Sequence, residues 1–297
     1  MDPLPTWLQA AITRAPLYAN LLKRGWPTHC HEVDDLETVA TNMDDPLGGR
    51  GDPAQSPVVY SQVAQDLALY WGLDAADLER TALTLADSWR DLGIQSGDRV
   101  GFYDYSSSPL VAYASRAFMP HLDRGAADVL TCLPICNDGL PELAERCAHI
   151  LEYVQPSTLF IEADAVDPLL RVLDKATPRP DRMVVTADDR LVSTDKINEW
   201  QQTMGTTVRQ MLRCDTALFF APPCAFDPLT FHPSVTGFRV EAVDLDPADG
   251  SPSPGRIAVT NLAVRSSVVV RYLTSFHGVV RSTQCRCGRN GPQVTIL

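Results

Sequence analysis

The sequence predicts an α/β fold: a mostly parallel sheet with flanking helices, followed by a β-rich C-terminal subregion. Up to about residue 220, segments with helical periodicity alternate with short apolar runs, which is typical of βα units that build a parallel sheet. Strand and helix recur about every 25 residues, as in doubly wound folds. Beyond that point, short strand-like segments joined by Pro-, Gly- and Asp-rich turns indicate an antiparallel meander.

The first clear helix follows Asp74, whose carboxylate can accept hydrogen bonds from the open amides of the first turn. Its sequence, ADLERTALTLADSWRDLG, places apolar residues on one face, and Gly93 is the residue type that ends a helix. Strands are then expected at 99–103, 129–135, 157–161 and 183–186, and helices at 138–153, at 165–175 and in a run that ends near Arg213. Further strands are expected at 217–221, 238–243, 257–261, 268–272 and 279–281.

The chain has 297 residues, which is enough for one large domain or two small ones. Its 23 prolines and 17 glycines lie mainly in the connections between expected elements and form no long linker. We therefore expect one compact unit with two subregions, an α/β body over residues 1–215 and a β-rich subregion over residues 216–297.

The composition excludes several classes of protein. A chain that is 45% hydrophobic and 21% charged is typical of a globular protein, not of a disordered or fibrous one. No apolar run approaches the roughly 20 residues of a membrane-spanning helix, and MDPLPTWLQA has no cationic segment ahead of an apolar stretch. A net charge of −12, from 25 Lys and Arg against 37 Asp and Glu, disfavours nucleic acid as a partner. These features predict a cytoplasmic protein with neither a membrane nor a nucleic-acid partner.

Eight cysteines are too few for a disulfide framework in a chain of this length, so closely spaced cysteines are candidate metal ligands. Cys285 and Cys287 stand two residues apart, and the neighbouring Arg286, Gly288 and Arg289 favour thiolate ions and permit a tight turn. The alternative is that the spacing is fortuitous and no metal binds there.

Three stretches of the chain carry a family resemblance. Near the start, RAPLYANLLKRGW precedes an acidic DDLETVA, and later LADSWRDLGIQSGDRV combines a helix, a glycine stop, a turn and a strand. Over about 60 residues near the end, HPSVTGFRVEAVD, DGSPSPGRIAVTNL, VVVRYLT and CRCGRNGPQV follow in order. Together they resemble the phenylacetate-CoA ligase family, a branch of the adenylate-forming acyl-CoA synthetase superfamily. The resemblance implies the large domain of those enzymes and an ancestral role in activating aromatic carboxylic acids.

Four elements of adenylation depart from the family pattern. SPVVYSQVAQDLALYW, without a glycine between Gly51 and Gly72, stands where the family has a phosphate loop of the type SSGTTG. The acidic "YGxsE" turn corresponds to FAPPC at residues 220–224, and Phe276 takes the place of the ribose-binding aspartate. The sequence ends at Leu297, about where the family's small C-terminal domain with its catalytic lysine begins. The resemblance therefore predicts a truncated relative, without that small domain, that does not use ATP.

The resemblance also implies a zinc site. In the metal-containing branch of the family, one Cys, one His and a terminal Cys-x-Cys hold one zinc, and the matching residues here are Cys224, His232, Cys285 and Cys287. Three thiolates and one imidazole make a closed tetrahedral site with a structural role. The competing interpretation places Cys224 in the core, since free cysteine is a common buried residue.

An aryl-carboxylate or acyl-CoA pocket is expected at the carboxyl edge of the parallel sheet, where open α/β sheets leave a crevice. The candidate lining residues are Tyr103, Tyr105, Phe219 and Phe220, and packing in the core is the alternative for the two phenylalanines.

Three hypotheses for function follow. The first is a protein that binds a small aromatic acid or acyl-CoA without adenylating it, with structural zinc. The second is an enzyme of altered chemistry, such as ATP-independent acyl transfer or condensation on a preformed activated substrate, with Cys132, Cys136 or His277 as nucleophile or base. The third is a scaffold subunit that binds a protein partner.

Overall fold

The computed structural model describes residues 4–23, 30, 32, 35, 45, 47–51, 58–64, 67–95, 98–104, 131–136, 141–243 and 254–297, with 58–64, 67–70 and 131–136 as backbone. Its centre is a five-stranded sheet in the order β4-β3-β5-β6-β7, in which every neighbouring pair is parallel. The strands are β3 (Arg99–Tyr103), β4 (Thr131–Cys136), β5 (Thr158–Glu162), β6 (Arg182–Thr186) and β7 (Thr207–Gln210). The parallel α/β sheet expected from the sequence is confirmed.

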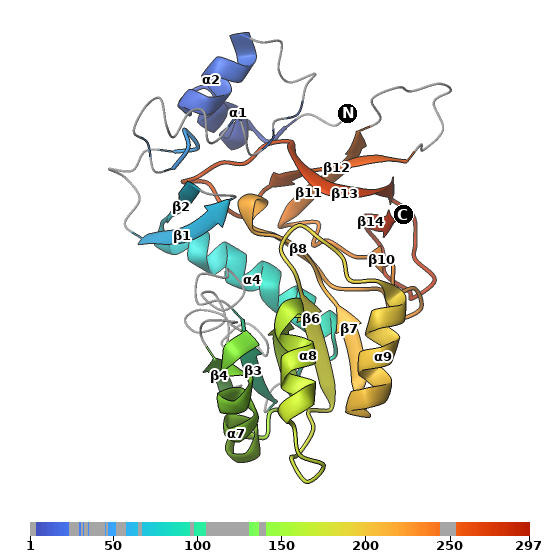
Figure 1. Ribbon diagram of the computed structural model, residues 1–297. Helices are drawn as coiled ribbons and strands as arrows, with labels where there is room; N and C mark the ends of the chain where they lie inside the picture. Colours follow the sequence, from blue (N-terminus) through green and yellow to red (C-terminus); the bar gives the residue numbers. More distant parts are fainter. Residues whose placement is uncertain are drawn as a thin grey trace.

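Helices cover both faces of this sheet. Figure 1 shows α7 (Ala144–Val154), α8 (Ala163–Val172) and α9 (Thr194–Met204) along one face, where they bury one hydrophobic cluster. On the other face, Trp89 of α4 (Ala75–Asp91) stacks on Phe160, with ring centroids 5.1 Å apart. Alternate residues of β3, β5 and β6 thus enter different clusters, as the two-residue period of a strand requires.

Both ends of α4 form as the sequence predicts. The carboxylate of Asp74 accepts from the amide of Asp77 (2.6 Å), and Asp77 accepts from the amide of Asp74 (3.3 Å), which makes a reciprocal cap. Gly93 lies just beyond the helix at φ +79°, a conformation that favours glycine. Asp77 also accepts from the amide of Arg265 (2.8 Å), so the cap joins α4 to the C-terminal half of the chain.

A second, antiparallel sheet has the order β10-β14-β13-β12-β11 and lies above the parallel sheet in Figure 1. Its strands are β10 (Thr230–Phe231), β11 (Phe238–Val243), β12 (Gly255–Asn261), β13 (Tyr272–Arg281) and β14 (Gln293–Ile296). The expected meander is present, but the strand expected at 268–272 is wrong except for its last residue, and the strand expected at 279–281 is the end of a longer one. Residues 272–281 form a single strand, and the chain turns before it at Arg271, whose φ is +53°.

The helix expected to run to Arg213 is also wrong in extent. It ends at Met204 because Gly205 adopts φ +68° and the β-branched residues that follow favour strand. The edge strand β7 and then β8 (Leu212–Cys214) occupy the remainder, and β8 pairs with β9 (Phe219–Ala221).

Two further pairs of elements complete the described fold. The strands β1 (Val58–Ala64) and β2 (Leu67–Leu73) form an antiparallel hairpin. The N-terminal helices α1 (Thr6–Ile12) and α2 (Pro16–Lys23) pack on the same core as α4, and the hydroxyl of Tyr18 accepts from the amide of Val270 (2.8 Å). No helix in the described residues is long and apolar enough to cross a membrane.

One hydrophobic cluster contains residues from both subregions that the sequence predicts. Trp89 and Phe160 belong to the first subregion, and Val259 and Val294 of the same cluster belong to the second. The antiparallel sheet therefore packs on α4 and the parallel sheet through a shared core.

Candidate metal centre and the carboxyl edge of the parallel sheet

Four potential metal ligands meet in the antiparallel part of the fold. Cys224 lies beyond β9, His232 follows β10, and Cys285 and Cys287 lie between β13 and β14. One ligand atom from each residue lies within 4.8 Å of the other three. These are the four residues that the family resemblance implies, and the fold brings all of them together.

Backbone hydrogen bonds position the first two ligands. The amide of Cys224 donates to the carbonyl of Thr230 (2.6 Å), and the amide of His232 donates to the carbonyl of Pro222 (2.9 Å). Asp227 accepts from the hydroxyl of Thr230 (2.7 Å) and helps close the intervening turn. The two ligands therefore lie across a short antiparallel pairing.

The other two ligands share one tight turn. The amide of Cys285 donates to the carbonyl of Arg289 (2.7 Å), and the amide of Gly288 donates to the carbonyl of Cys285 (2.9 Å). Gly288 has φ +90°, which strains any residue with a side chain. The guanidinium of Arg289 pairs with Asp91 at the end of α4, so the turn is attached to the helix.

The distances within the cluster fit a tetrahedral metal. The Sγ atoms of Cys224 and Cys285 are 3.7 Å apart, and the Sγ of Cys287 lies 3.3 Å from the Nε2 of His232. With Zn–S bonds of about 2.3 Å, neighbouring ligands of a tetrahedral zinc lie roughly 3.5–3.8 Å apart, whereas a disulfide needs about 2.05 Å. The donor set suits a closed structural site and leaves no position for a substrate.

The protonation states of the four ligands make metal binding dependent on pH. Burial lowers the pKa of His232, which favours the neutral imidazole that a metal binds. Burial raises the pKa of Cys287 to about 11. Burial opposes ionisation of Cys285 too, but its hydrogen bonds, foremost from the amide of Cys287, outweigh burial and lower its pKa. A metal must therefore displace protons, so its affinity should rise with pH.

A cluster of buried charges occupies the carboxyl edge of the parallel sheet. Arg213, 2% exposed, reaches from β8 and donates through Nη1 to Asp104 (2.8 Å), which follows β3. Its Nε donates to Asp215 (2.7 Å), and Glu162 at the end of β5 lies 3.6 Å away. This cluster was not expected from the sequence, because its members come from separate segments without a local motif. In the sequence, this cluster is indicated by nothing more than an acidic residue at or just after the end of successive apolar strands.

The carboxyls of this edge titrate in an unusual range. Burial raises the pKa of Glu162 to about 7, and the neighbouring Asp104 adds to the effect. Burial likewise opposes the charge on Arg213, but Asp104 and Asp215 outweigh it and hold the pKa of Arg213 above its ordinary value.

The loop after β6 is bonded directly to the antiparallel sheet. Asp189, at φ +48°, accepts from the amide of Ser275 through both carboxylate oxygens (3.0 Å each), and the hydroxyl of Ser275 donates to its carbonyl. The amide of Asp189 donates to the carbonyl of Arg213 (2.9 Å). The hydrogen bonds of Asp189 therefore join the two sheets at the carboxyl edge. Phe276, the next residue along β13, is 4% exposed.

The structure separates the aromatic residues expected around an aryl pocket. Tyr103 is fully buried in the cluster beneath α7, α8 and α9. Phe219 and Phe220 lie in the other cluster, where both rings pack edge-on against Phe238, with centroids 5.0 and 5.2 Å apart. Tyr105 lies outside the described residues. The aryl pocket at these positions stays a prediction.

The nucleophiles of the second hypothesis do not form a catalytic arrangement within the described part of the chain. His277 is exposed on β13, and its Nδ1 lies 3.2 Å from the backbone carbonyl of Ser275. Cys132 and Cys136 lie on β4, whose side chains are outside the described part of the structure.

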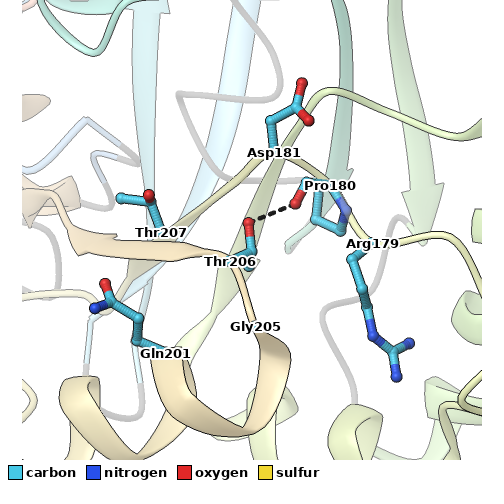
Figure 2. A pocket seen from close by; sticks show the side chains of 7 residues that line it. All are labelled: Arg179, Pro180, Asp181, Gln201, Gly205, Thr206 and Thr207. Atoms are coloured by element: carbon cyan, nitrogen blue, oxygen red, sulfur yellow. Dashed lines mark hydrogen bonds between the residues drawn. The ribbon is translucent and has the colours of Figure 1, made fainter.

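A polar hollow of about 580 Å³ lies at the opposite, amino edge of β6 and β7. Figure 2 shows Arg179 and Asp181 pointing away from each other across it, while the hydroxyl of Thr206 donates to the carbonyl of Pro180 (2.5 Å). Polar groups do not converge on one point there, so the hollow is a weaker candidate than the metal cluster and the carboxyl edge.

Comparison with known proteins identifies the fold. No family model matches the sequence, and no curated protein sequence matches it. Among solved structures, an open conformation of 2-hydroxyisobutyryl-CoA ligase in complex with 2-HIB-AMP and CoA is similar over 97% of this chain and 71% of the ligase chain, with a TM-score of 0.77 and 15% identity. In the postadenylation state of that ligase, the chain covers 64% of the ligase.

More distant structures agree. An anthranilate CoA ligase in complex with anthranoyl-AMP is similar over 69% of this chain and 39% of its own, with a TM-score of 0.53 and 12% identity. The O-succinylbenzoate coenzyme A synthetase of Bacillus subtilis is similar over 83% of this chain and 62% of its own, with a TM-score of 0.52 and 10% identity. The chain therefore has the fold of adenylate-forming CoA ligases and spans less than two thirds of the length of several of them.

The raised pKa of Glu162 predicts that stability falls as the pH rises. A carboxyl whose pKa is higher in the folded state stabilises the fold below its unfolded pKa, and that contribution is lost as the pH passes the folded value of about 7. When the pH rises from 4.5 to 7.5, the free energy of unfolding should therefore fall by about 1–3 kcal/mol less for Glu162→Gln than for the wild type. Urea unfolding at both pH values measures this difference.

Glu145→Gln, an exposed change on α7, is the matched control and should leave the pH dependence unchanged. Equal slopes for wild type and Glu162→Gln would show that Glu162 ionises normally.

Proposed function

We propose that this chain is a CoA-ligase-fold protein that carries one structural zinc and binds a small aryl acid or its CoA thioester without activating the acid with ATP. The observation that carries the proposal is the β1–β2 hairpin. Its pairing runs from Val58↔Leu73 to Ala64↔Leu67, so two residues connect the strands. A phosphate cradle needs a run of small residues whose amides surround the phosphate oxygens, and a two-residue connection does not supply one.

The contacts at the carboxyl edge support the same conclusion. Asp189 is bonded to Ser275, the neighbour of Phe276, which stands where the resemblance implies the ribose-binding aspartate. The surrounding Asp104, Glu162 and Asp215 share the guanidinium of Arg213. The carboxylates at this edge disfavour a polyphosphate there, and the buried phenyl ring disfavours a ribose.

The acid and the thioester are proposed from the fold relatives. The structurally similar ligases are described with 2-HIB-AMP and CoA and with anthranoyl-AMP. A relative that lost the phosphate-binding loop but kept the fold would still bind the acid or its thioester, because neither ligand depends on that loop.

The zinc is proposed from the donor set. Three cysteines and one histidine with the observed spacing between ligand atoms suit zinc better than magnesium or calcium, which prefer oxygen ligands. The ion would hold the 223–232 turn against the Cys285–Cys287 knuckle, and through Arg289 and Asp91 it would anchor the antiparallel sheet to α4. Its role would be structural.

Metal analysis tests the zinc. The purified chain should contain about one zinc, and Cys285→Ser or Cys287→Ser should lose it and lower the melting temperature by more than about 5 °C, because binding energy of a structural metal is folding energy. Cys30→Ser changes a cysteine outside the cluster and should keep the metal. Wild-type protein without metal, with melting unchanged by a chelator, would contradict the assignment.

Two assays on one preparation test the absence of adenylation. With phenylacetate or benzoate, the chain should catalyse no acid-dependent exchange of pyrophosphate into ATP, while an active CoA ligase serves as the positive control. In calorimetry without nucleotide, benzoyl-CoA should bind. Robust exchange would overturn the proposal, and a chain that binds no thioester while a protein co-purifies with it would favour the scaffold hypothesis.

A further inference from the structure

Exposed apolar side chains gather near the metal cluster and the end of β14. Within the described residues, seven large apolar side chains are exposed, and four of them are Phe226, Leu229, Val235 and Leu297. The side chain of Phe226 is 64% exposed, although it lies in the turn that carries Cys224. Single exposed apolar residues are ordinary, whereas a group of them in one region indicates a surface that binds another molecule.

Contacts join part of this group into one surface. The guanidinium of Arg286, in the Cys285–Cys287 knuckle, lies 5.7 Å from the centroid of the Phe226 ring. Phe226 and Leu229 line the same hollow. The carbonyl of Leu229 also accepts from the amide of Ile296 (2.9 Å), so the end of β14 lies beside the turn. We call the surface formed by Phe226, Leu229 and Arg286 the knuckle face.

The hollow beside the knuckle face has a volume of about 290 Å³. Ile197 of α9 and Val208 of β7 contribute further apolar wall. The volume is at the lower end for pockets that hold a whole ligand, so the hollow suits one large apolar side chain better than a CoA thioester. Protein interfaces commonly bury an aromatic or aliphatic anchor in a hollow of this kind.

The C-terminal part of the chain is basic, although the chain as a whole is acidic. Residues 250–297 contain six arginines and no lysine, aspartate or glutamate, whereas the whole chain has a net charge of −12. Arg281 and Arg286 are exposed, and no carboxylate in the described part of the chain pairs with either. Asp227, the one acidic residue that lines the hollow, already accepts two hydrogen bonds within its own turn (2.7 and 3.0 Å). These charges are complementary to an acidic partner.

We propose that the knuckle face docks an acidic segment of a partner protein, with one apolar side chain of that segment in the hollow and a carboxylate near Arg286. Aromatic residues and arginine are the residue types that protein interfaces favour. A nucleic acid fits less well, because two free arginines do not match a run of phosphates on a chain of net charge −12. The proposal rests neither on the absence of adenylation nor on thioester binding, since the knuckle face contains no residue of the carboxyl edge or of the β1–β2 hairpin.

Selection from a random peptide library displayed on phage tests the surface, with the zinc-loaded chain as bait. The enriched peptides should be rich in Asp and Glu and should carry an aromatic or large aliphatic residue. A fluorescein-labelled copy of the most enriched peptide should bind saturably in fluorescence anisotropy. Its affinity should fall at least about threefold between low salt and about 0.3 M salt, because exposed charges are screened.

Two variants locate the binding on the knuckle face. Phe226→Ala should weaken peptide binding at least about tenfold, because it removes an exposed aromatic contact. It keeps the backbone amide that donates to the Sγ of Cys224 (3.4 Å), so the zinc content should be unchanged. Arg286→Gln should weaken binding more at low salt than at high salt. Tyr153→Ala, at a 72% exposed aromatic residue on α7, and Arg146→Gln, at an exposed arginine of the same helix, are the matched controls and should bind like the wild type.

The proposal fails if no peptide is enriched, if the enriched peptides are neutral or basic, or if Phe226→Ala binds the peptide as the wild type does. Tighter binding of a single-stranded oligonucleotide, or of vesicles of phosphatidylcholine and phosphatidylserine, than of the best peptide would also overturn it. Zinc content and pyrophosphate exchange are measured without the peptide, so failure here and failure of the proposed function are distinguishable.

Discussion

The buried guanidinium of Arg213 is the interaction on which the junction of the two sheets depends. Asp104 at the end of β3 and Asp215 beyond β8 hold it, with Glu162 close by. An arginine that is 2% exposed is tolerated only with such partners, and removing one leaves an uncompensated charge at a cost of about 3–5 kcal/mol. The same residue accepts the amide of Asp189 at its carbonyl, and Asp189 reaches Ser275 on β13. The parallel strands, β8 and the antiparallel sheet are therefore linked through one connected set of hydrogen bonds and ion pairs.

This linkage has a chemical consequence. Open α/β sheets commonly bind ligands at the carboxyl edge of their strands. Here that edge carries acidic side chains that share one guanidinium, that of Arg213. The frame of a CoA ligase is kept, since the chain matches one over 97% of its length. The proposed absence of adenylation rests on three local features: the two-residue connection between β1 and β2, the contact of Asp189 with Ser275, and the buried ring of Phe276.

Local signals in the sequence predict some of these features and not others. The cap at Asp74 and the stop at Gly93 predict α4 correctly because both act within a few residues. The spacing of Cys285 and Cys287 indicates a possible metal site, whereas Cys224 and His232 are added by the family resemblance, and the structure brings all four together. By contrast, β7 has four residues directly after a helix, and the Arg213 cluster draws on segments far apart in the chain. Their formation depends on long-range pairing and burial, which leave little local pattern.

The most direct test of this account is binding of a stable acyl-adenylate mimic, 5′-O-(N-benzoylsulfamoyl)adenosine, measured by calorimetry and by thermal melting of the zinc-loaded chain. The mimic joins an aryl acid to adenosine, and a site with a ribose anchor and an open carboxyl edge would bind it tightly. Because Asp189 is bonded to Ser275, and because Phe276 stands where the family resemblance implies the ribose-binding aspartate, we expect no saturable heat and no rise in melting temperature. Tight, stoichiometric binding that stabilises the protein would contradict it.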